Sequence, residues 1–132
     1  MSQIRVVVGS LEKFTTRLIQ SITLDLTANL IETTPRDTGW ARANWVPNIG
    51  SSIDKTAGTR ELAEAGKIDS GPQQSGLASV ARYRLDQGAI FISNNVPYIT
   101  RLNEGSSRQA PSGFVQQQIF RAIRQNVGKV GR

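Results

Sequence analysis

The stretch TPRDTGWARANW at residues 34–45 ends a long helical pattern and redirects the chain. Pro35 disfavours the α conformation in the residue before it, so a preceding helix must end there. Asp37 to Gly39 follows as a polar turn, built from residue types that accept tight backbone geometry. We expect Gly39 to Asn44 to form one helical turn that leads Trp45 into a short strand.

A second stretch, NNVPYITRLNEGSSRQAPSGFV at residues 94–115, also places proline and glycine where regular elements must stop. Asn94 and Asn95 accept left-handed backbone and bond to nearby amides, so we favour a structural corner over a ligand site. Gly105 and Gly113 are expected to meet backbone requirements, at least one of them with positive φ. The segment lacks the GK[ST] ending of a phosphate-binding loop, so that function is not expected.

Helical patterns flank these stretches. From Leu11 to about Glu32, apolar residues recur at steps of three and four, which predicts a long amphipathic helix. Gln73 to Leu85 predicts a shorter helix, and Pro111 is suited to open a closing helix that runs to Val127. In the closing helix an apolar stripe at i, i+4 spacing is expected to face the core. Its members are Val115, Ile119, Ile123 and Val127.

Short strands and one long polar segment complete the organisation. The valine-rich Gln3 to Val8 predicts a strand, and AIFIS at residues 89–93 is apolar enough to predict a central strand. Residues 51–72 have little apolar content apart from a brief helical pattern at Thr59 to Ala65, so we expect an extended mobile loop used in assembly. The chain therefore predicts a single domain, 1–132, of the α+β class. Its small mixed or antiparallel sheet packs against a long N-terminal helix and a C-terminal helix.

The composition argues against several kinds of chemistry. The 132 residues include no histidine and no cysteine, which removes the usual general base, the commonest transition-metal ligand, disulfides and thiol nucleophiles. We find no apolar run of about 18 residues and no signal-peptide pattern at the N-terminus, which is typical of a cytoplasmic protein without a membrane partner. We expect no enzyme activity, no catalytic residue, no cofactor and no bound metal.

The chain is basic. Sixteen Lys and Arg against ten Asp and Glu give a net charge of +6, which attracts polyanions at low salt. Most of the basic residues are arginine, which suits carboxylates at protein interfaces as well as phosphates. The surplus is greatest from Arg101 onward, and we interpret this as a solvated or subunit-facing basic end.

Three blocks of residues within the two stretches follow the patterns TP-x-DTG-x-x-R-x-x-W, NN-x-PY and L-x-x-G-x-S-x-QAP-x-G-x-V. The matching residues are Thr34, Pro35, Asp37, Thr38, Gly39, Arg42, Trp45, Asn94, Asn95, Pro97, Tyr98, Leu102, Gly105, Ser107, Gln109, Ala110, Pro111, Gly113 and Val115. In order and spacing these blocks resemble the small tail-component, or neck and tail-completion, proteins of long-tailed double-stranded DNA bacteriophages. The resemblance covers about a quarter of the chain.

The resemblance implies a structural virion protein at the head-to-tail junction, assembled in the host bacterial cytoplasm. Its implied partners are further copies of itself in a ring, with sixfold symmetry as a guess, head-closure or connector proteins, and a tail-terminator or tail-tube protein. DNA would pass through the ring without sequence-specific contact. The expected interface or structural residues are Asp37, Thr38, Gly39, Arg42, Trp45, Asn94, Asn95, Pro97, Tyr98, Arg101, Gly105, Gln109 and Pro111.

Other functions remain open at this point. A tail-terminator ring is an alternative within the phage interpretation, and a small basic nucleic-acid-binding protein is the main alternative outside it. A hydrolase that holds metal with carboxylates alone is a third class. Asp37 and Glu104 could pair as a general acid and base, but they are better explained as a turn residue and as an ion-pair partner of Arg101 or Arg108.

The aromatic residues have structural interpretations. We expect Trp45 in the core and Trp40 at an interface, because the chain's few aromatic residues are not interleaved with lysine as on a surface that stacks bases. Tyr98 is expected to be mostly buried behind residues 89–93, with its hydroxyl hydrogen-bonded.

Overall fold

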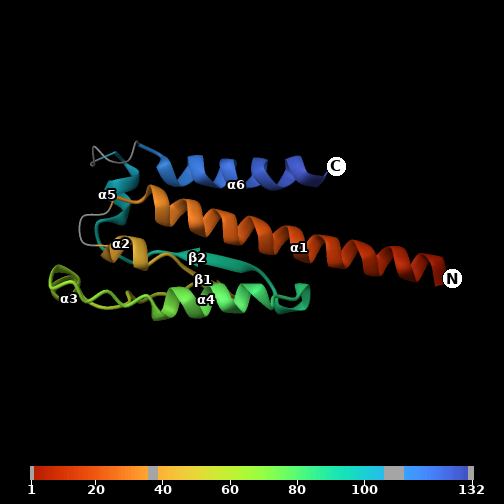
Figure 1. Cartoon of the computed structure of the whole chain (residues 1–132), viewed down its shortest axis with the longest axis horizontal. Coiled ribbons are helices and arrows are strands. Elements are labelled where there is room, and N and C mark those ends of the chain that lie inside the picture. The colour runs from red at the N-terminus through yellow and green to blue at the C-terminus, as the bar shows by residue number, and fades with distance from the viewer. Residues whose placement is uncertain (1, 36–38, 106–111, 131–132) are drawn as a thin grey trace.

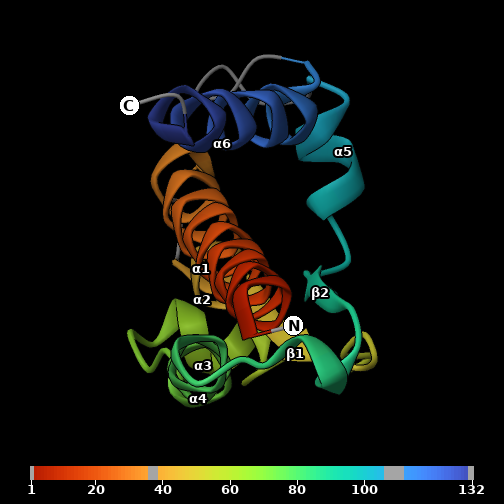
Figure 2. The ribbon, with the colours of Figure 1, turned by 90° about the vertical axis from the view of Figure 1, so that its right-hand side faces the viewer.

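The computed structural model describes residues 2–35, 39–105 and 112–130, with side chains described for 13–35, 39–105 and 112–128. The long helix α1 (Ser2–Thr33) lies between two layers (Figures 1 and 2). One layer is α6 (Phe114–Val130), and the other contains α4 (Gly71–Ala81) and the sheet. The N-terminal part of α1 extends past the other elements in Figure 1. The α+β class, with a small sheet packed against N- and C-terminal helices, is confirmed.

Helix α1 begins earlier than the sequence predicts. Residues 3–8 are helical and Gly9 does not interrupt the helix, so the predicted strand there is wrong. The spacing from Ile4 to Val8 to Leu11 continues the helical stripe, and valine lowers helix propensity by only about 0.5 kcal/mol per residue. The 32 residues of α1 correspond to a length of about 48 Å.

The end of α1 and the turn after it follow the expectation. The Thr34 amide donates to the Leu30 carbonyl at 3.0 Å, and the helix stops before Pro35. Gly39 then has φ of 83° and precedes α2 (Trp40–Ala43), which is the predicted helical turn. The predicted turn residues Asp37 and Thr38 lie outside the described residues.

The sheet pairs two strands in the described part of the chain. β1 (Val46–Ile49) runs antiparallel to β2 (Ile90–Ser93), with Pro47 opposite Ile92. The prediction that residues 89–93 form a central strand is therefore wrong, and the Phe91 side chain is 41% exposed. A strand paired on one side tolerates Pro47, which has no amide proton to donate.

Residues 51–72 contribute to the core, contrary to expectation. Helix α3 (Arg60–Glu64) confirms the brief helical pattern. Ala57 and Ala63 are buried, and Ala63 packs in one cluster with Trp40 and Val96. The segment therefore supplies two residues to the core of the monomer, and its mobility and its use in assembly stay predictions.

After α4 the chain makes a 3-10 turn, η1 (Leu85–Gln87), and returns as β2. Helix α4 ends at Ala81, so the predicted helix from Gln73 to Leu85 is correct only in its first part. Helix α5 (Ile99–Asn103) follows the corner that contains Asn94 and Asn95. Pro111, proposed to open the closing helix, lies outside the described residues, and α6 begins at Phe114.

Two adjoining clusters form the core. Leu30, Trp45 and Phe114 make the first, and it joins α1, the residue just before β1, and α6. Trp40 is 7% exposed and belongs to the second, so the prediction that it lies at an interface is wrong, while the core position of Trp45 is confirmed. Ile99 packs against both clusters and so connects them.

A helical glycine allows α4 to lie against β1. A Cβ atom added at Gly76 would stand 2.1 Å from the Pro47 carbonyl oxygen, whereas one added at Gly128 in α6 would meet nothing within 4 Å. Gly76→Ala should therefore cost roughly 1 to 3 kcal/mol by overpacking, and Gly128→Ala should stabilise by up to about 1 kcal/mol. Urea unfolding measures both, and equal effects would show that α4 moves away freely.

Candidate functional site

We call the turn at residues 34–45 the first corner and the turn at residues 94–98 the second corner. One buried side-chain amide holds the first corner in place. Asn44 is 2% exposed; its Nδ2 donates to the carbonyls of Trp40 and Ala57, and its Oδ1 accepts from the Ala57 amide at 2.6 Å. The Trp40 indole Nε1 donates to the same Ala57 carbonyl at 3.0 Å. These bonds attach the 51–72 segment to α2.

Thr34 and Arg42 join the end of α1 to α2 and β1. The Trp45 indole Nε1 donates to Thr34 Oγ1 at 2.7 Å, within the core. Arg42 Nε donates to the Thr34 carbonyl at 2.6 Å, and Arg42 Nη2 donates to the Glu32 carbonyl at 3.3 Å. Arg42 thus satisfies carbonyls that the helix end leaves without an intrahelical partner.

The two asparagines of the second corner make the structural contacts that we expected. Asn94 Nδ2 donates to the Ala41 carbonyl at 2.9 Å, and its Oδ1 accepts from the Val96 amide at 3.1 Å. Asn95 Nδ2 donates to the Ile53 carbonyl at 2.6 Å. The structural corner is confirmed, and it holds the first corner and the 51–72 segment together.

Tyr98 differs from its prediction. Its side chain is half-buried, and it packs on Trp40 with ring centroids 6.0 Å apart and planes at 59°. It belongs to the Trp40 cluster and not to the space behind β2. Within the described residues its hydroxyl has no hydrogen bond, so the predicted bond is wrong.

The remaining predicted residues lie outside this hydrogen-bonded group. Gly105 has φ of 95° and Gly113 has φ of 75°, which confirms the expected backbone requirement at both positions. Pro97 and Arg101 are exposed, and no ion pair joins Glu104 to Arg101 among the described residues. The residues that fall outside the described part are Asp37, Thr38, Arg108, Gln109 and Pro111.

The corners therefore form a structural hub, which we define as Thr34, Trp40, Arg42, Asn44, Trp45 and Asn94. The buried polar atoms of these residues form hydrogen bonds with other protein groups, and these bonds stabilise the fold. Across the described residues, no group of three or more Asp, Glu, His or Cys is placed to hold a metal ion. None of the helices described there combines the length and apolar character of a membrane-spanning segment.

Helix α6 packs on α1 through a face that is partly polar. Phe114, Gln118, Ala122 and Asn126 are the buried residues of α6, spaced four apart. Asn126 Nδ2 donates to Asp25 Oδ2 at 2.9 Å, and Asn29 Nδ2 donates to Gln125 Oε1 at 3.3 Å. A buried polar seam of this kind specifies how the two helices align.

The apolar stripe predicted to face the core is exposed instead, apart from the half-buried Val115. Ile119, Phe120, Ile123 and Val127 are 37%, 64%, 40% and 55% exposed. At 3.6 residues per turn they lie within about 100° of the helix circumference, so they form one continuous face. We call these four residues the α6 face. An exposed apolar face rimmed by polar residues is typical of a protein interaction site.

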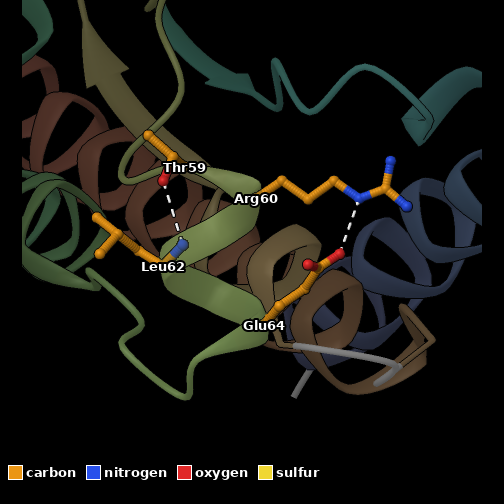
Figure 3. Close-up of polar contacts among 4 residues, drawn as sticks. All are labelled: Thr59, Arg60, Leu62 and Glu64. Carbon is orange, nitrogen blue, oxygen red and sulfur yellow. Dashed lines mark hydrogen bonds and ion pairs between the residues drawn. The ribbon is translucent and has the colours of Figure 1, made fainter.

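Two further large apolar side chains are exposed on α3 and in the segment after it. Leu62 is 44% exposed and Ile68 is 38% exposed, and we call this pair the α3 patch. Thr59 caps α3 by accepting from the Leu62 amide at 3.2 Å, and Arg60 pairs with Glu64 at 3.1 Å (Figure 3). Leu62 and the Arg60–Glu64 pair project from opposite sides of α3 in Figure 3.

Sequence reasoning missed the α6 face because it assumed that the more apolar side of a helix is buried. Nothing in the sequence indicated that the polar residues Gln118 and Asn126 would be buried. The small residue Ala122, at the centre of the buried stripe, was a weak indication that this side of the helix packs closely on another element.

Comparisons with known proteins find no family model, no curated protein and no solved structure that matches this chain.

The hub can be tested at Thr34. Thr34→Val keeps the shape of the side chain and leaves the buried Trp45 indole N–H without an acceptor, so it should cost roughly 1 to 3 kcal/mol of unfolding free energy. Thr33→Val is the matched control, because its hydroxyl only donates to the Asn29 carbonyl one turn earlier, and it should change stability by less than about 0.5 kcal/mol. Denaturant melts followed by tryptophan fluorescence measure both, and equal losses would remove Thr34 from the hub.

Proposed function

We propose that this chain is a structural protein of the phage head-to-tail junction, a neck or tail-completion ring that helps to join DNA-filled heads to tails. The observation that carries the proposal is the α6 face, four large apolar side chains that the monomer leaves partly exposed to water. The three sequence blocks that resemble the phage family support the same function. In this proposal the protein works through interfaces and catalyses no reaction.

A ring requires two different patches on each subunit, since a head-to-tail contact joins unlike surfaces. The α6 face and the α3 patch meet this requirement, because α6 and α3 lie in the opposite outer layers of Figure 2. Residues 114–128 contain two basic residues and no acidic one, whereas three acidic residues in 60–69 outnumber two basic ones. The α6 face of one subunit can pack against the α3 patch of the next through the apolar side chains that both leave exposed.

The size of the contact favours a closed ring over a pair. Complete burial of one large apolar side chain contributes roughly 1.5 to 3 kcal/mol, and those of the α6 face are already partly covered. Association costs about 4 to 15 kcal/mol of lost freedom, so one such contact is marginal. In a closed ring every subunit makes two contacts, and breaking one does not release a subunit.

The first test concerns the α6 face. Phe120→Ser combined with Val127→Ser should leave the thermal midpoint within a few degrees and abolish rings with a central hole in electron micrographs, since both side chains are mostly exposed. Gln117→Ser combined with Arg121→Ser, on the side of α6 away from this face, is the matched control and should still form rings. A wild-type protein that stays monomeric would contradict the assembly proposal.

In phage production the same variants test the role in joining. A phage carrying the serine pair at Phe120 and Val127 should accumulate filled heads and separate tails, whereas the control pair should give infectious virions. Joined virions from the first variant would contradict a role in joining that depends on this face.

The second test asks whether the contact is head-to-tail. The variant Leu62→Ser with Ile68→Ser keeps the α6 face, and the variant Phe120→Ser with Val127→Ser keeps the α3 patch. Each alone should be a monomer, and their mixture should form a dimer of about 29 kDa, twice the chain's 14.4 kDa, in mass photometry or ultracentrifugation. Self-association of the Leu62 and Ile68 variant would instead show that α6 pairs with itself.

A further inference from the structure

An open cleft lies between the N-terminal half of α1 and the turn η1, away from both apolar patches. Its volume is about 590 Å³. Figure 1 shows the turn that follows α4 beneath this part of α1. The lining residues are Lys13, Thr16, Arg17, Gln20, Arg84, Leu85 and Asp86.

Both walls of the cleft are held in place. Gln20 Nε2 donates to the carbonyls of Val80 and Ala81 at 3.0 and 3.2 Å, which ties α1 to the end of α4. On the other wall, the Tyr83 hydroxyl donates to the Gly88 carbonyl at 2.5 Å and closes the loop that contains η1. The lining side chains therefore project from a fixed frame.

The cleft is positively charged. Lys13 and Arg17 are one helical turn apart on α1, and Arg84 lies across from them. Asp86 is the one acidic residue of the lining among the residues whose side chains are described, and its Oδ1 is 3.4 Å from Arg84 Nε. Both side chains of that pair are more than 70% exposed, so the pair is weak and leaves the outer guanidinium nitrogens available.

We infer that this cleft binds the phosphate backbone of duplex DNA without reading its sequence. Lys, Arg, Thr and Gln are the side chains that contact phosphate and sugar oxygens. In the described part of the lining there is no aromatic residue on which an unpaired base would stack, which favours a duplex over a single strand. The inference does not depend on ring assembly, because the seven lining residues come from one subunit.

The test is the salt dependence of binding to a short fluorescent DNA duplex, followed by anisotropy. The variant Lys13→Gln, Arg17→Gln, Arg84→Gln should bind more weakly, with a salt slope shallower by about 2 to 3, since each lost phosphate contact removes about 0.9. The matched control removes the same charge at exposed residues outside the cleft, Lys55→Gln, Lys67→Gln, Arg101→Gln, and should keep the wild-type slope.

Asp86→Asn offers a change of opposite sign, because it removes the negative charge of the cleft and should tighten binding. Two unrelated duplex sequences should bind equally.

Equal slopes for the cleft and control variants would overturn the inference and assign DNA binding to diffuse surface charge. Stronger binding of a single strand than of a duplex would also overturn it. Measurements on the Phe120→Ser, Val127→Ser background separate this result from the outcome of the assembly tests.

Discussion

The buried amide of Asn44 is the interaction on which the rest of this structure depends. It bonds both the amide and the carbonyl of Ala57, and so attaches a polar segment to the end of α2. That carbonyl also accepts the Trp40 indole N–H, and Trp40 in turn packs on Tyr98. Loss of a partner in such a network leaves a buried polar group without a bond, at roughly 1 to 3 kcal/mol each. The two corners therefore form one unit.

The residues that stabilise the fold and the residues proposed to bind partners lie on different parts of the molecule. The hub satisfies its own polar atoms and so offers little to a ligand. Helix α6 holds its place against α1 with Phe114, Ala122 and Asn126, and its Ile119, Phe120, Ile123 and Val127 stay partly exposed to solvent. This arrangement is unfavourable for an isolated monomer, because a large part of four apolar side chains stays in contact with water. It is what a subunit of an assembly requires, and on it the proposed ring rests.

The proposed interactions occupy separate places on the subunit. The α6 face and the α3 patch lie in opposite outer layers, and the basic cleft lies beside the projecting part of α1. A change in one of these surfaces leaves the other two available, so assembly and DNA contact can be measured independently. The DNA-binding alternative and the ring proposal are compatible, since they concern different residues of one subunit.

The sequence by itself determined where the elements end. Pro35 stopped α1, Gly39 and the two asparagines formed the corners, and α2 and α3 appeared where local patterns predicted them. These are effects of adjacent residues on φ, ψ and nearby hydrogen bonds, so they can be read locally.

The tertiary structure decided which surfaces are covered. Gln3 to Val8 became helix by continuing α1, Ala57 and Ala63 became core, and α6 turned its apolar residues outward. Those outcomes depend on which distant residues meet, and hydrophobic periodicity states only that a helix has two faces, not which of them finds a partner within the same chain.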